Sequence, residues 1–204
     1  MIITAIDDKK DLFLISDLVT EELMVELSKV VLEDIPSTIS LGQEHWKRRK
    51  LVVESESILE QIEYCITSQT ETIGKLIGKS IRYIHTMFWL DFQGFTVRPH
   101  FDHSFVGTVL HLYLKDCENM GTVFYNPNKD DIEYRDDNGQ LVHYTADADT
   151  YSTTPIRHAF ECKKNTGYLM VNNDKQLHGV PNILPDSELR LSAYCYLNFD
   201  TIDE

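Results

Sequence analysis

Two histidines and one aspartate have the residue types and the spacing to hold a metal ion. His100 and Asp102 are two positions apart, so on an extended strand their side chains point to the same face. His178, far along the chain, can supply a third ligand. Two imidazoles and one carboxylate on one side of a metal suit Fe(II) and leave the opposite coordination positions open. The set therefore predicts a metal centre that can also bind small molecules.

Arg190 is a cation that could bind a carboxylate beside these metal ligands. Arg190 follows His178 by twelve residues and shares a strand face with Ser192. Its planar guanidinium can bind a carboxylate through two parallel hydrogen bonds, a geometry that a lysine cannot copy. A dicarboxylic co-substrate of the metal would need such a cation.

The pair His100 and Asp102 is weak evidence on its own. With 8 histidines in 204 residues, about one His-x-Asp is expected by chance. The context strengthens it, because the pair ends a candidate strand, His178 follows a second candidate strand and Arg190 opens a third. The four residues therefore count as one constellation.

The stretch from about Phe88 to Phe199 resembles the Fe(II)/2-oxoglutarate-dependent dioxygenases, and most of all their prolyl-4-hydroxylase-like branch. The segments that carry the resemblance are GFTVRPHFD, VLHLYL, GTVFY, NTGYLMVNNDKQLHGV and RLSAYCYLNF. The resemblance implies an enzyme that uses Fe(II), 2-oxoglutarate as co-substrate and O₂. It also implies that the metal ligands are His100, Asp102 and His178, and that the distal carboxylate of 2-oxoglutarate binds Arg190.

The same resemblance implies further co-substrate residues. Ser192 and Tyr113 would donate hydrogen bonds to the distal carboxylate, and Val180 would shield the co-substrate. His111 departs from the family pattern, in which an aliphatic residue often stands two positions before the tyrosine. It either bonds the co-substrate or is a satisfied core histidine, and the second alternative is slightly favoured.

Three residues are candidates for substrate contacts. Arg98 lies two positions before His100, so it should point toward the metal rim. It either holds a carboxylate of the substrate or pairs with an acidic neighbour. Tyr125 and Asn126 are expected at the entrance of the site.

The order of elements predicts a mainly β fold with N-terminal helices: a double-stranded β-helix, or jelly roll, flanked by helices on one sheet. We expect a single domain over residues 1–204, with helical support over 1–80 and the jelly-roll core over 81–204. In Thr108–Leu114, the leucines share the face toward the helices, and Val109, His111 and Tyr113 share the face toward a polar interior. The strand candidates are 81–91, 95–102, 106–114, 121–125, 141–145, 156–162, 166–172 and 189–199.

Several local signals organise the remaining segments. Residues 12–16 predict a strand, and Thr20 predicts a helix N-cap. Ser57-x-x-Glu60 is a capping-box pattern for a second helix, whose apolar stripe runs to Gly78. We expect residues 36–50 to be irregular, with the basic run 47–50 as a solvated loop. The acidic segment 126–155 predicts a long loop or hairpin, either a solvated insertion or a mobile wall over the site.

Composition limits the partners and the compartment. The net charge of −14 and the pI of about 4.9 work against binding to nucleic acid or anionic membranes. Four widely spaced cysteines indicate reduced thiols in a cytoplasmic protein. The acidic N-terminus does not have the pattern of a signal peptide, and no apolar run approaches the ~20 residues of a membrane helix.

Other metal sites and jelly-roll proteins fit these residues less well. A typical cupin uses His-x-His with a following Glu, and a JmjC-type pocket has no Arg twelve residues after the distal His. Zinc could bind through His100 and His103, but no cysteine partner supports it. A non-catalytic metal- or ligand-binding module on the same jelly roll is the alternative from a different class. The substrate is expected to be a peptidyl or free amino acid or another small molecule.

Overall fold

The computed structural model describes residues 1–30, 37–38, 47–53, 56–102, 107–127, 154–173 and 176–199. The helices in these ranges are α1 (Glu21–Lys29), α2 (Ile58–Thr67) and α3 (Thr70–Ile77). The strands are β1 (Ile2–Ala5), β2 (Leu12–Ser16), β3 (Ser37–Thr38), β4 (Arg48–Leu51), β5 (Ile81–Asp91), β6 (Val97–His100), β7 (Thr108–Tyr113), β8 (Val123–Tyr125), β9 (Ile156–Ala159), β10 (Thr166–Val171), β11 (His178–Val180) and β12 (Arg190–Phe199).

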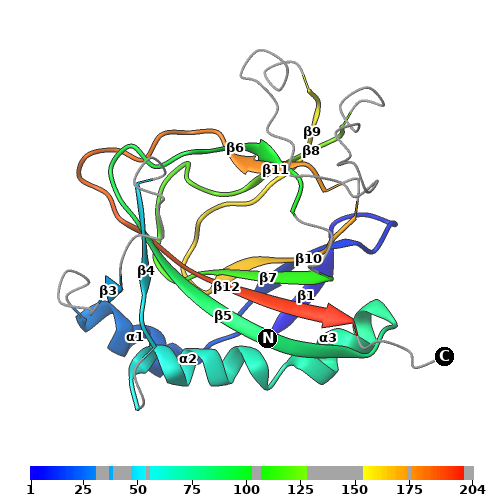
Figure 1. Ribbon diagram of the computed structural model, residues 1–204, viewed down its shortest axis with the longest axis horizontal. Helices are drawn as coiled ribbons and strands as arrows, with labels where there is room; N and C mark the ends of the chain where they lie inside the picture. The colour runs from blue at the N-terminus through cyan, green and yellow to red at the C-terminus, as the bar shows by residue number, and fades with distance from the viewer. Residues whose placement is uncertain are drawn as a thin grey trace.

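Two antiparallel sheets lie one above the other, with the helices below the larger one (Figure 1). The larger sheet has the order β1-β2-β10-β7-β12-β5-β4-β3, and the smaller has the order β6-β11-β8-β9. Strands β5 to β12 are divided equally between the sheets, as in a double-sheet jelly roll. The predicted mainly β, jelly-roll-like fold is therefore confirmed, while the strand candidate 141–145 lies outside the described residues.

Side-chain caps determine where two of the helices begin. The hydroxyl of Thr20 accepts a hydrogen bond from the backbone N–H of Leu23 at 3.4 Å. The hydroxyl of Ser57 accepts one from the N–H of Glu60 at 3.1 Å. Both predicted caps are thus confirmed, each satisfying a backbone donor that has no partner inside its helix.

The single apolar stripe predicted up to Gly78 is divided between α2 and α3. The N–H of Gln69 bonds the carbonyl of Ile66, three residues back, which tightens the last turn and ends α2. The Ser68 hydroxyl donates at 2.8 Å to the carbonyl of Cys65, which Gln69 would have used in a continuous helix. Gly78 ends α3 with a φ of 70°, as predicted.

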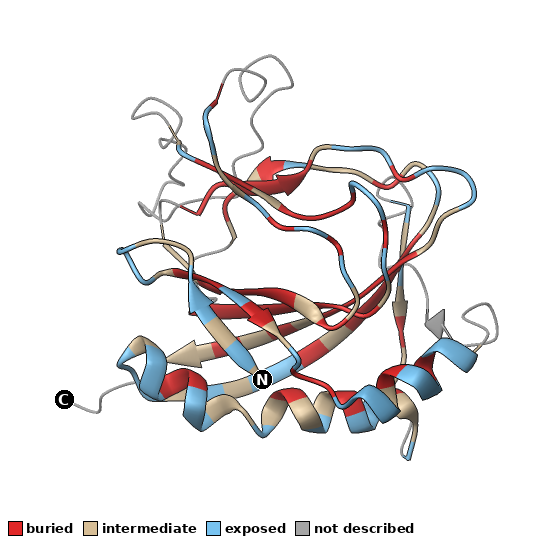
Figure 2. Cartoon of the chain, turned by 180° about the vertical axis from the view of Figure 1, so that it is seen from behind, coloured by how far each residue is buried: buried red, intermediate tan, exposed pale blue. Residues whose placement is uncertain are grey.

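Each face of the larger sheet has its own apolar core. Leu110, Leu112 and Leu114 belong to a cluster that includes residues of all three helices. Val109 and Tyr113 belong to a second cluster, shared with residues of the smaller sheet. This confirms the predicted alternation along β7. Figure 2 shows buried residues between the two sheets and on the sides of the helices that face the larger sheet.

The N-terminal part of the chain contributes strands as well as helices. Strand β2 forms at the predicted residues 12–16 and pairs with β10. The segment 36–50, predicted to be irregular, contains β3 and most of β4, and β4 pairs with β5. The prediction of a solvated loop at 47–50 is wrong, because Arg48 lies opposite Asp91 and forms an ion pair with it. The support predicted over residues 1–80 thus extends the larger sheet at both edges.

Packing and hydrogen bonds hold this fold together without covalent cross-links. All four cysteines are free, in agreement with the predicted reduced thiols. In the part of the chain that the structure describes, no helix has both the length and the apolar character to cross a membrane. Apart from its first and last two residues, the acidic segment 126–155 lies outside the described residues, so its predicted role as a loop or wall remains an expectation.

Candidate metal and co-substrate site

His100, Asp102 and His178 come together on the smaller sheet. His100 ends β6, His178 begins β11, and the two strands pair with these histidines opposite each other. The Oδ1 atom of Asp102 lies 3.6 Å from Nε2 of His100 and 3.9 Å from Nε2 of His178. Each residue offers one ligand atom, and these atoms lie within 4.8 Å of one another. The three residues could therefore hold a metal ion from one side.

Backbone carbonyls orient both imidazoles. Nδ1 of His100 lies 2.9 Å from the carbonyl oxygen of Arg98, and Nδ1 of His178 lies 2.8 Å from that of Gln176. Because a carbonyl only accepts hydrogen bonds, each Nδ1 carries the proton and each Nε2 carries the lone pair that a metal needs. Phe124 stacks on the His178 ring with centroids 5.2 Å apart, which fixes the ring plane.

The second carboxylate oxygen of Asp102 has its own partner. Tyr194 donates a hydrogen bond from its hydroxyl to Oδ2 at 3.0 Å, which leaves Oδ1 directed toward the histidines. Burial raises the pKa of Asp102, but the adjacent imidazoles of His178 and His100 and the hydrogen bond from Tyr194 together lower that pKa well below its ordinary value. The carboxylate is therefore ionised, as a metal ligand must be.

Tyr194 was not among the residues predicted from the sequence. The signal that could have found it is the alternation of β12, in which Tyr194 follows Arg190 and Ser192 on the same face. Its hydrogen bond to Asp102 connects the two sheets, and the two residues are 92 positions apart in the sequence. No local pattern encodes such a contact.

A polar network lies behind His178. The side chain of Gln176, whose carbonyl orients His178, accepts a hydrogen bond from Arg157 at 3.1 Å. Arg157 of β9 also donates to Asp7 at 2.7 Å and to Asp11 at 2.5 Å. These contacts thus link the N-terminal hairpin, β9 and the segment that precedes His178.

The carboxyl of Asp7 gives this network a dependence on pH. Partial burial raises the pKa of Asp7, but the hydrogen bond and charge of Arg157 lower it further, so its net pKa in the folded protein lies below 3.8. A lowered pKa contributes stability above the unfolded-state value, and this contribution is lost as the pH falls through the folded-state value. Asp7→Asn should therefore reduce the free energy of unfolding at pH 6 by up to about 1 kcal/mol, because the pair is partly exposed.

Urea unfolding of Asp7→Asn and of the unchanged protein at several pH values checks this expectation. The difference between them should shrink as the pH falls below about 4. Asp8→Asn is the matched control, because Asp8 is an exposed neighbour in the same turn. A difference that stays constant or grows toward low pH would contradict the role given to Asp7.

An unbroken run of contacts leads from the three candidate ligands to Arg190. Tyr194, bonded to Asp102, lies with its ring 5.1 Å from that of His111, and His111 lies 4.8 Å from the ring of Tyr113. The guanidinium carbon of Arg190 is 5.2 Å from the Tyr113 ring. The predicted metal ligands and the predicted co-substrate residues thus border one interior.

Arg190 is fully buried and already has hydrogen-bond partners. Its Nε donates to the carbonyl of Met120 at 3.0 Å, and its Nη1 donates to Asp91 at 2.6 Å. The side chain also forms a hydrogen bond with the sulfur of Cys162. The predicted fork-like pairing of Arg190 with a co-substrate carboxylate would therefore share the guanidinium with Asp91.

Two buried polar atoms near Arg190 lack a hydrogen-bond partner among the described residues. They are Oγ of Ser192 and Nδ1 of His111. A buried polar group without a partner costs about 1–3 kcal/mol, so each of these atoms would gain from a ligand or water that supplies the missing hydrogen bond. Donors at these two positions beside a cation fit a carboxylate ligand, which is the chemistry that 2-oxoglutarate would bring.

The slight preference for a satisfied core histidine at position 111 is not supported, because the Nδ1 atom of His111 has no partner among the described residues. Burial lowers the pKa of His111 well below its ordinary value, and the charges of Arg190 and Arg48 lower it further. The imidazole is therefore neutral and can donate one hydrogen bond from Nδ1. Its ring packs between Tyr113, Tyr168 and Tyr194, which fixes its orientation.

The hydroxyl of Tyr113 is held by a neighbour of the site. It donates to Oγ1 of Thr122 at 2.9 Å and accepts from the N–H of Thr122 at 2.8 Å. Burial raises the pKa of Tyr113, so the phenol stays neutral. To donate to a carboxylate, as the family resemblance implies, its proton must turn away from Thr122. Val180 lies in the apolar cluster between the sheets, as its predicted shielding role requires.

The predicted substrate residues differ in their burial. Arg98 and Asn126 are exposed. Tyr125 is buried in a small cluster with Phe101 and Leu177, on the other side of β8 from Phe124. The expectation that Tyr125 lines the entrance is therefore not supported by its packing, which instead braces the segments beside His100 and His178.

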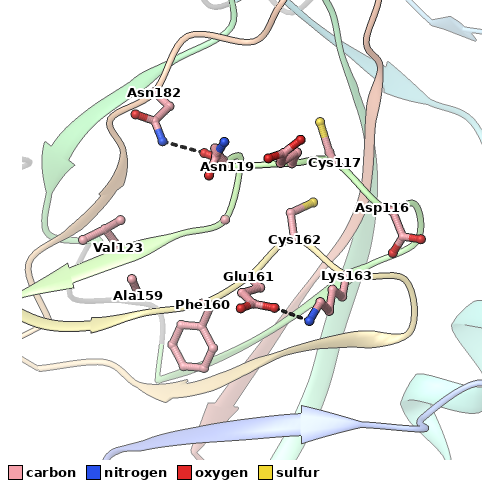
Figure 3. Close-up of a pocket in the computed structure, with 12 residues that line it drawn as sticks. Asp116, Cys117, Asn119, Val123, Ala159, Phe160, Glu161, Cys162, Lys163 and Asn182 are labelled. Carbon is pink, nitrogen blue, oxygen red and sulfur yellow. Dashed lines mark hydrogen bonds and ion pairs between the residues drawn. The ribbon is translucent and has the colours of Figure 1, made fainter.

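A separate hollow of about 780 Å³ lies over the β7–β8 and β9–β10 connections (Figure 3). None of the three candidate metal ligands lines it. Burial raises the pKa of the Cys162 thiol to about 11, so this sulfur is not an activated nucleophile. The hollow therefore offers no chemistry that competes with the site on the smaller sheet. Its lining residues are Asp116, Cys117, Glu118, Asn119, Gly121, Val123, Ala159, Phe160, Glu161, Cys162, Lys163 and Asn182.

Neither a protein-family model nor a curated protein matches the chain. Solved structures are similar to it. A prolyl-4-hydroxylase from Pseudomonas putida covers 94% of this chain and 94% of its own, with a TM-score of 0.59 and 12% identity. HygX from Streptomyces hygroscopicus, solved with nickel and 2-oxoglutarate, covers 92% of this chain and 82% of its own, with a TM-score of 0.60 and 11% identity.

The epimerase SnoN is similar to the same extent. Solved with Fe3+, alpha ketoglutarate and nogalamycin RO, it covers 92% of this chain and 78% of its own, with a TM-score of 0.60 and 14% identity. At such identities the similarity shows the fold. The chain thus has the fold of the Fe(II)/2-oxoglutarate oxygenases, and the resemblance predicted from the sequence is confirmed at that level.

Proposed function

We propose that this protein is an Fe(II)- and 2-oxoglutarate-dependent dioxygenase that hydroxylates a C–H bond. One observation carries the proposal: His100, Asp102 and His178 converge within 4.8 Å, in an interior that also holds the buried Arg190 and the unpartnered hydroxyl of Ser192. The reaction would consume one O₂ and one 2-oxoglutarate. It would release the hydroxylated product, succinate and CO₂.

Fe(II) with 2-oxoglutarate and O₂ supplies an oxidant strong enough for an unactivated C–H bond. The work of the chain is to hold and orient the groups around it. His100 and His178 would bind the metal through Nε2, since their Nδ1 atoms bond backbone carbonyls. Asp102 would bind through Oδ1, while Tyr194 holds Oδ2 and keeps the carboxylate from rotating.

The distal carboxylate of 2-oxoglutarate would bind at Arg190. Arg190 offers its guanidinium N–H groups, Ser192 offers its hydroxyl and the neutral His111 offers Nδ1. These three donors are buried, so each hydrogen bond forms without competition from water. Apolar neighbours such as Phe124 and Val180 exclude water from the same interior.

The alternative, a non-catalytic binding module on the same jelly roll, is less well supported. Such a module needs no buried cation and no unpartnered hydroxyl beside a metal site. Here, the buried Arg190 and the unpartnered hydroxyl of Ser192 accompany the three ligand side chains. A co-substrate carboxylate would use both groups.

We infer that the substrate is a peptidyl or free amino acid or another small molecule. The similar structures include a prolyl-4-hydroxylase and an epimerase solved with nogalamycin RO, so this fold accepts both kinds of substrate elsewhere. The net charge of −14 disfavours nucleic acid, whose phosphates need a cationic surface.

A coupled assay for succinate tests both the reaction and the substrate class. Protein loaded with Fe(II) is supplied with 2-oxoglutarate, O₂ and a panel of free amino acids, proline-containing peptides and small metabolites. The proposal predicts that one class raises succinate release and yields a product heavier by one oxygen atom. Absence of 2-oxoglutarate consumption with every member of the panel would count against the proposed function.

Tyr194→Phe should weaken metal binding and leave the fold intact. Loss of the hydrogen bond to Oδ2 frees the Asp102 carboxylate to rotate, and such losses around a metal ligand cost about 10–100-fold in affinity. Anaerobic titration with Fe(II) measures the effect. Tyr196→Phe is the matched control, since Tyr196 lies on the same face of β12 but does not donate to Asp102. Equal Fe(II) affinities in Tyr194→Phe and Tyr196→Phe would contradict this role.

A further inference from the structure

Three charged side chains lie on one rung across three neighbouring strands of the larger sheet. Arg48 of β4 and Arg190 of β12 are each directly opposite Asp91 of β5, one on either side. Arg48 donates from Nε to Oδ1 of Asp91 at 2.6 Å and from Nη2 to Oδ2 at 3.1 Å. Arg190 donates from Nη1 to the same Oδ2 at 2.6 Å. One carboxylate thus serves two guanidiniums.

This rung is withdrawn from water. The side chains of Asp91 and Arg190 are 0% and 1% exposed, and that of Arg48 is 15% exposed. The guanidinium carbon of Arg48 lies 4.6 Å from the centre of the Phe95 ring, and that of Arg190 lies 5.4 Å from it. The electron-rich face of this ring attracts both cations and partly offsets their repulsion.

The rung carries a net charge of +1, because two guanidiniums share one carboxylate. A buried net charge is unfavourable unless an opposite charge compensates it. If Arg48 were absent, Asp91 would neutralise Arg190 completely, and the interior would have no positive charge left for a carboxylate. The field of both arginines extends into the interior, since both lower the pKa of His111.

The charges of the proposed complex balance only when Arg48 is counted. Fe(II) with one ionised aspartate and two neutral histidines carries +1. The rung adds another +1, and 2-oxoglutarate carries −2 at neutral pH. An interior with a neutral Arg190–Asp91 pair alone would leave the distal carboxylate uncompensated.

We propose that Arg48 is a positioning residue of the co-substrate site. Because Arg48 neutralises the charge of Asp91, the positive charge of Arg190 remains available to a ligand. This positive charge selects a dicarboxylic 2-oxo acid. The proposal rests on the function proposed above and extends it to the N-terminal strand β4. It assigns to Arg48 an effect on the distal carboxylate alone, with no effect on the metal ligands.

Two ligands of equal carbon number separate this effect from a general structural one. 2-Oxoglutarate has the distal carboxylate, and 2-oxopentanoate has a methyl group in its place. Their dissociation constants are measured by calorimetry with Mn(II) in the metal site, so that no turnover occurs. Thermal unfolding of each variant is recorded in parallel to verify that it is folded.

Arg48→Gln should weaken 2-oxoglutarate binding by about tenfold or more, the effect of one lost charge in a partly screened interior. Binding of 2-oxopentanoate should stay within about twofold of that of the unchanged protein, because the ligand has no distal charge. Arg48→Lys keeps the cation and should retain most of the affinity for 2-oxoglutarate. Equal weakening of both ligands, or equal losses in Arg48→Gln and Arg48→Lys, would overturn the proposal.

The double variant Arg48→Gln/Asp91→Asn is the sharper test. It removes one positive and one negative charge, so the rung keeps its net charge of +1, and the asparagine oxygen can still accept from Arg190. Its affinity for 2-oxoglutarate should recover to within about threefold of the unchanged protein, a strongly non-additive result for residues in contact. A double variant that binds no tighter than Arg48→Gln would show that net charge is not the cause.

The two proposals fail in different ways. If the unchanged protein binds 2-oxoglutarate and Arg190→Ala abolishes that binding, the co-substrate site of the proposed function stands, whatever the Arg48 variants do. If Arg48→Gln then binds 2-oxoglutarate normally, only the role of Arg48 is refuted. If the unchanged protein with Mn(II) does not bind 2-oxoglutarate, the proposed function and the role of Arg48 are both refuted.

Discussion

His178→Ala is expected to abolish metal binding at stoichiometric Fe(II) and to reduce succinate formation to the background without protein. His178 supplies one of three ligand atoms, and its ring is held by Phe124 and by the carbonyl of Gln176. Loss of a residue that only orients a metal ligand reduces metal affinity by up to roughly 100-fold. Loss of His178, which is itself a ligand, should reduce the Fe(II) affinity by at least this factor. Anaerobic equilibrium dialysis with Fe(II) measures the loss.

His158→Ala provides the matched control for this prediction. His158 is a half-buried histidine of β9 whose ring packs against Phe160, and it is not one of the three candidate ligands. It should keep both the Fe(II) stoichiometry and the succinate yield. A His178→Ala protein that binds Fe(II) as well as His158→Ala would remove His178 from the metal site.

Arg190→Lys and Arg190→Ala should both raise the dissociation constant for 2-oxoglutarate and leave Fe(II) binding intact. Removing one partner of a buried, hydrogen-bonded charge pair costs about 2–5 kcal/mol, or roughly 30- to several thousand-fold in affinity. The alanine variant should lie toward the upper part of this range. The lysine keeps the charge but cannot donate to Met120, Asp91 and a ligand in the fixed directions of a guanidinium.

Both Arg190 variants should fold, because Asp91 keeps its two hydrogen bonds from Arg48. Thermal unfolding and Fe(II) binding serve as internal controls for each protein. The expected pattern is a high KM for 2-oxoglutarate, with turnover recovered at saturating co-substrate in Arg190→Lys. An unchanged KM in both variants would exclude Arg190 from the co-substrate site.

Features that depend only on the spacing of residues a few positions apart could be predicted from the sequence. The spacing of His100 and Asp102, and the alternation from Arg190 to Ser192, place side chains on one face of a strand whatever the rest of the fold does. The same logic predicted the leucine face of β7 and the caps at Thr20 and Ser57. Each of these features depends on neighbours within a few residues, so a single sequence encodes it.

Contacts that depend on the pairing of distant strands could not be predicted in the same way. Arg48 meets Asp91 only because β4 pairs with β5 in one register, and a shift by one residue would direct Arg48 to the opposite face. Tyr194 meets Asp102 across the interior between the two sheets. The basic run at 47–50 therefore has the sequence pattern of a solvated loop, although the side chain of Arg48 pairs with the buried Asp91.

The packing of His111 illustrates a further limit. Sequence alone favoured a satisfied core histidine, since most buried polar groups have partners. Three tyrosines surround the ring, but none of them bonds its Nδ1 atom. Whether a buried donor is satisfied depends on exact side-chain geometry, which no residue pattern specifies.

A single-turnover experiment tests the central claim most directly. The protein is mixed anaerobically with one equivalent of Fe(II) and with 2-oxoglutarate, the visible absorption band of the metal–keto-acid complex is recorded, and O₂ is then admitted. The account predicts a band that requires both Fe(II) and 2-oxoglutarate, and that decays in O₂ as succinate forms at about one per site. No band at saturating Fe(II), or a band that persists in O₂ without succinate, would contradict it.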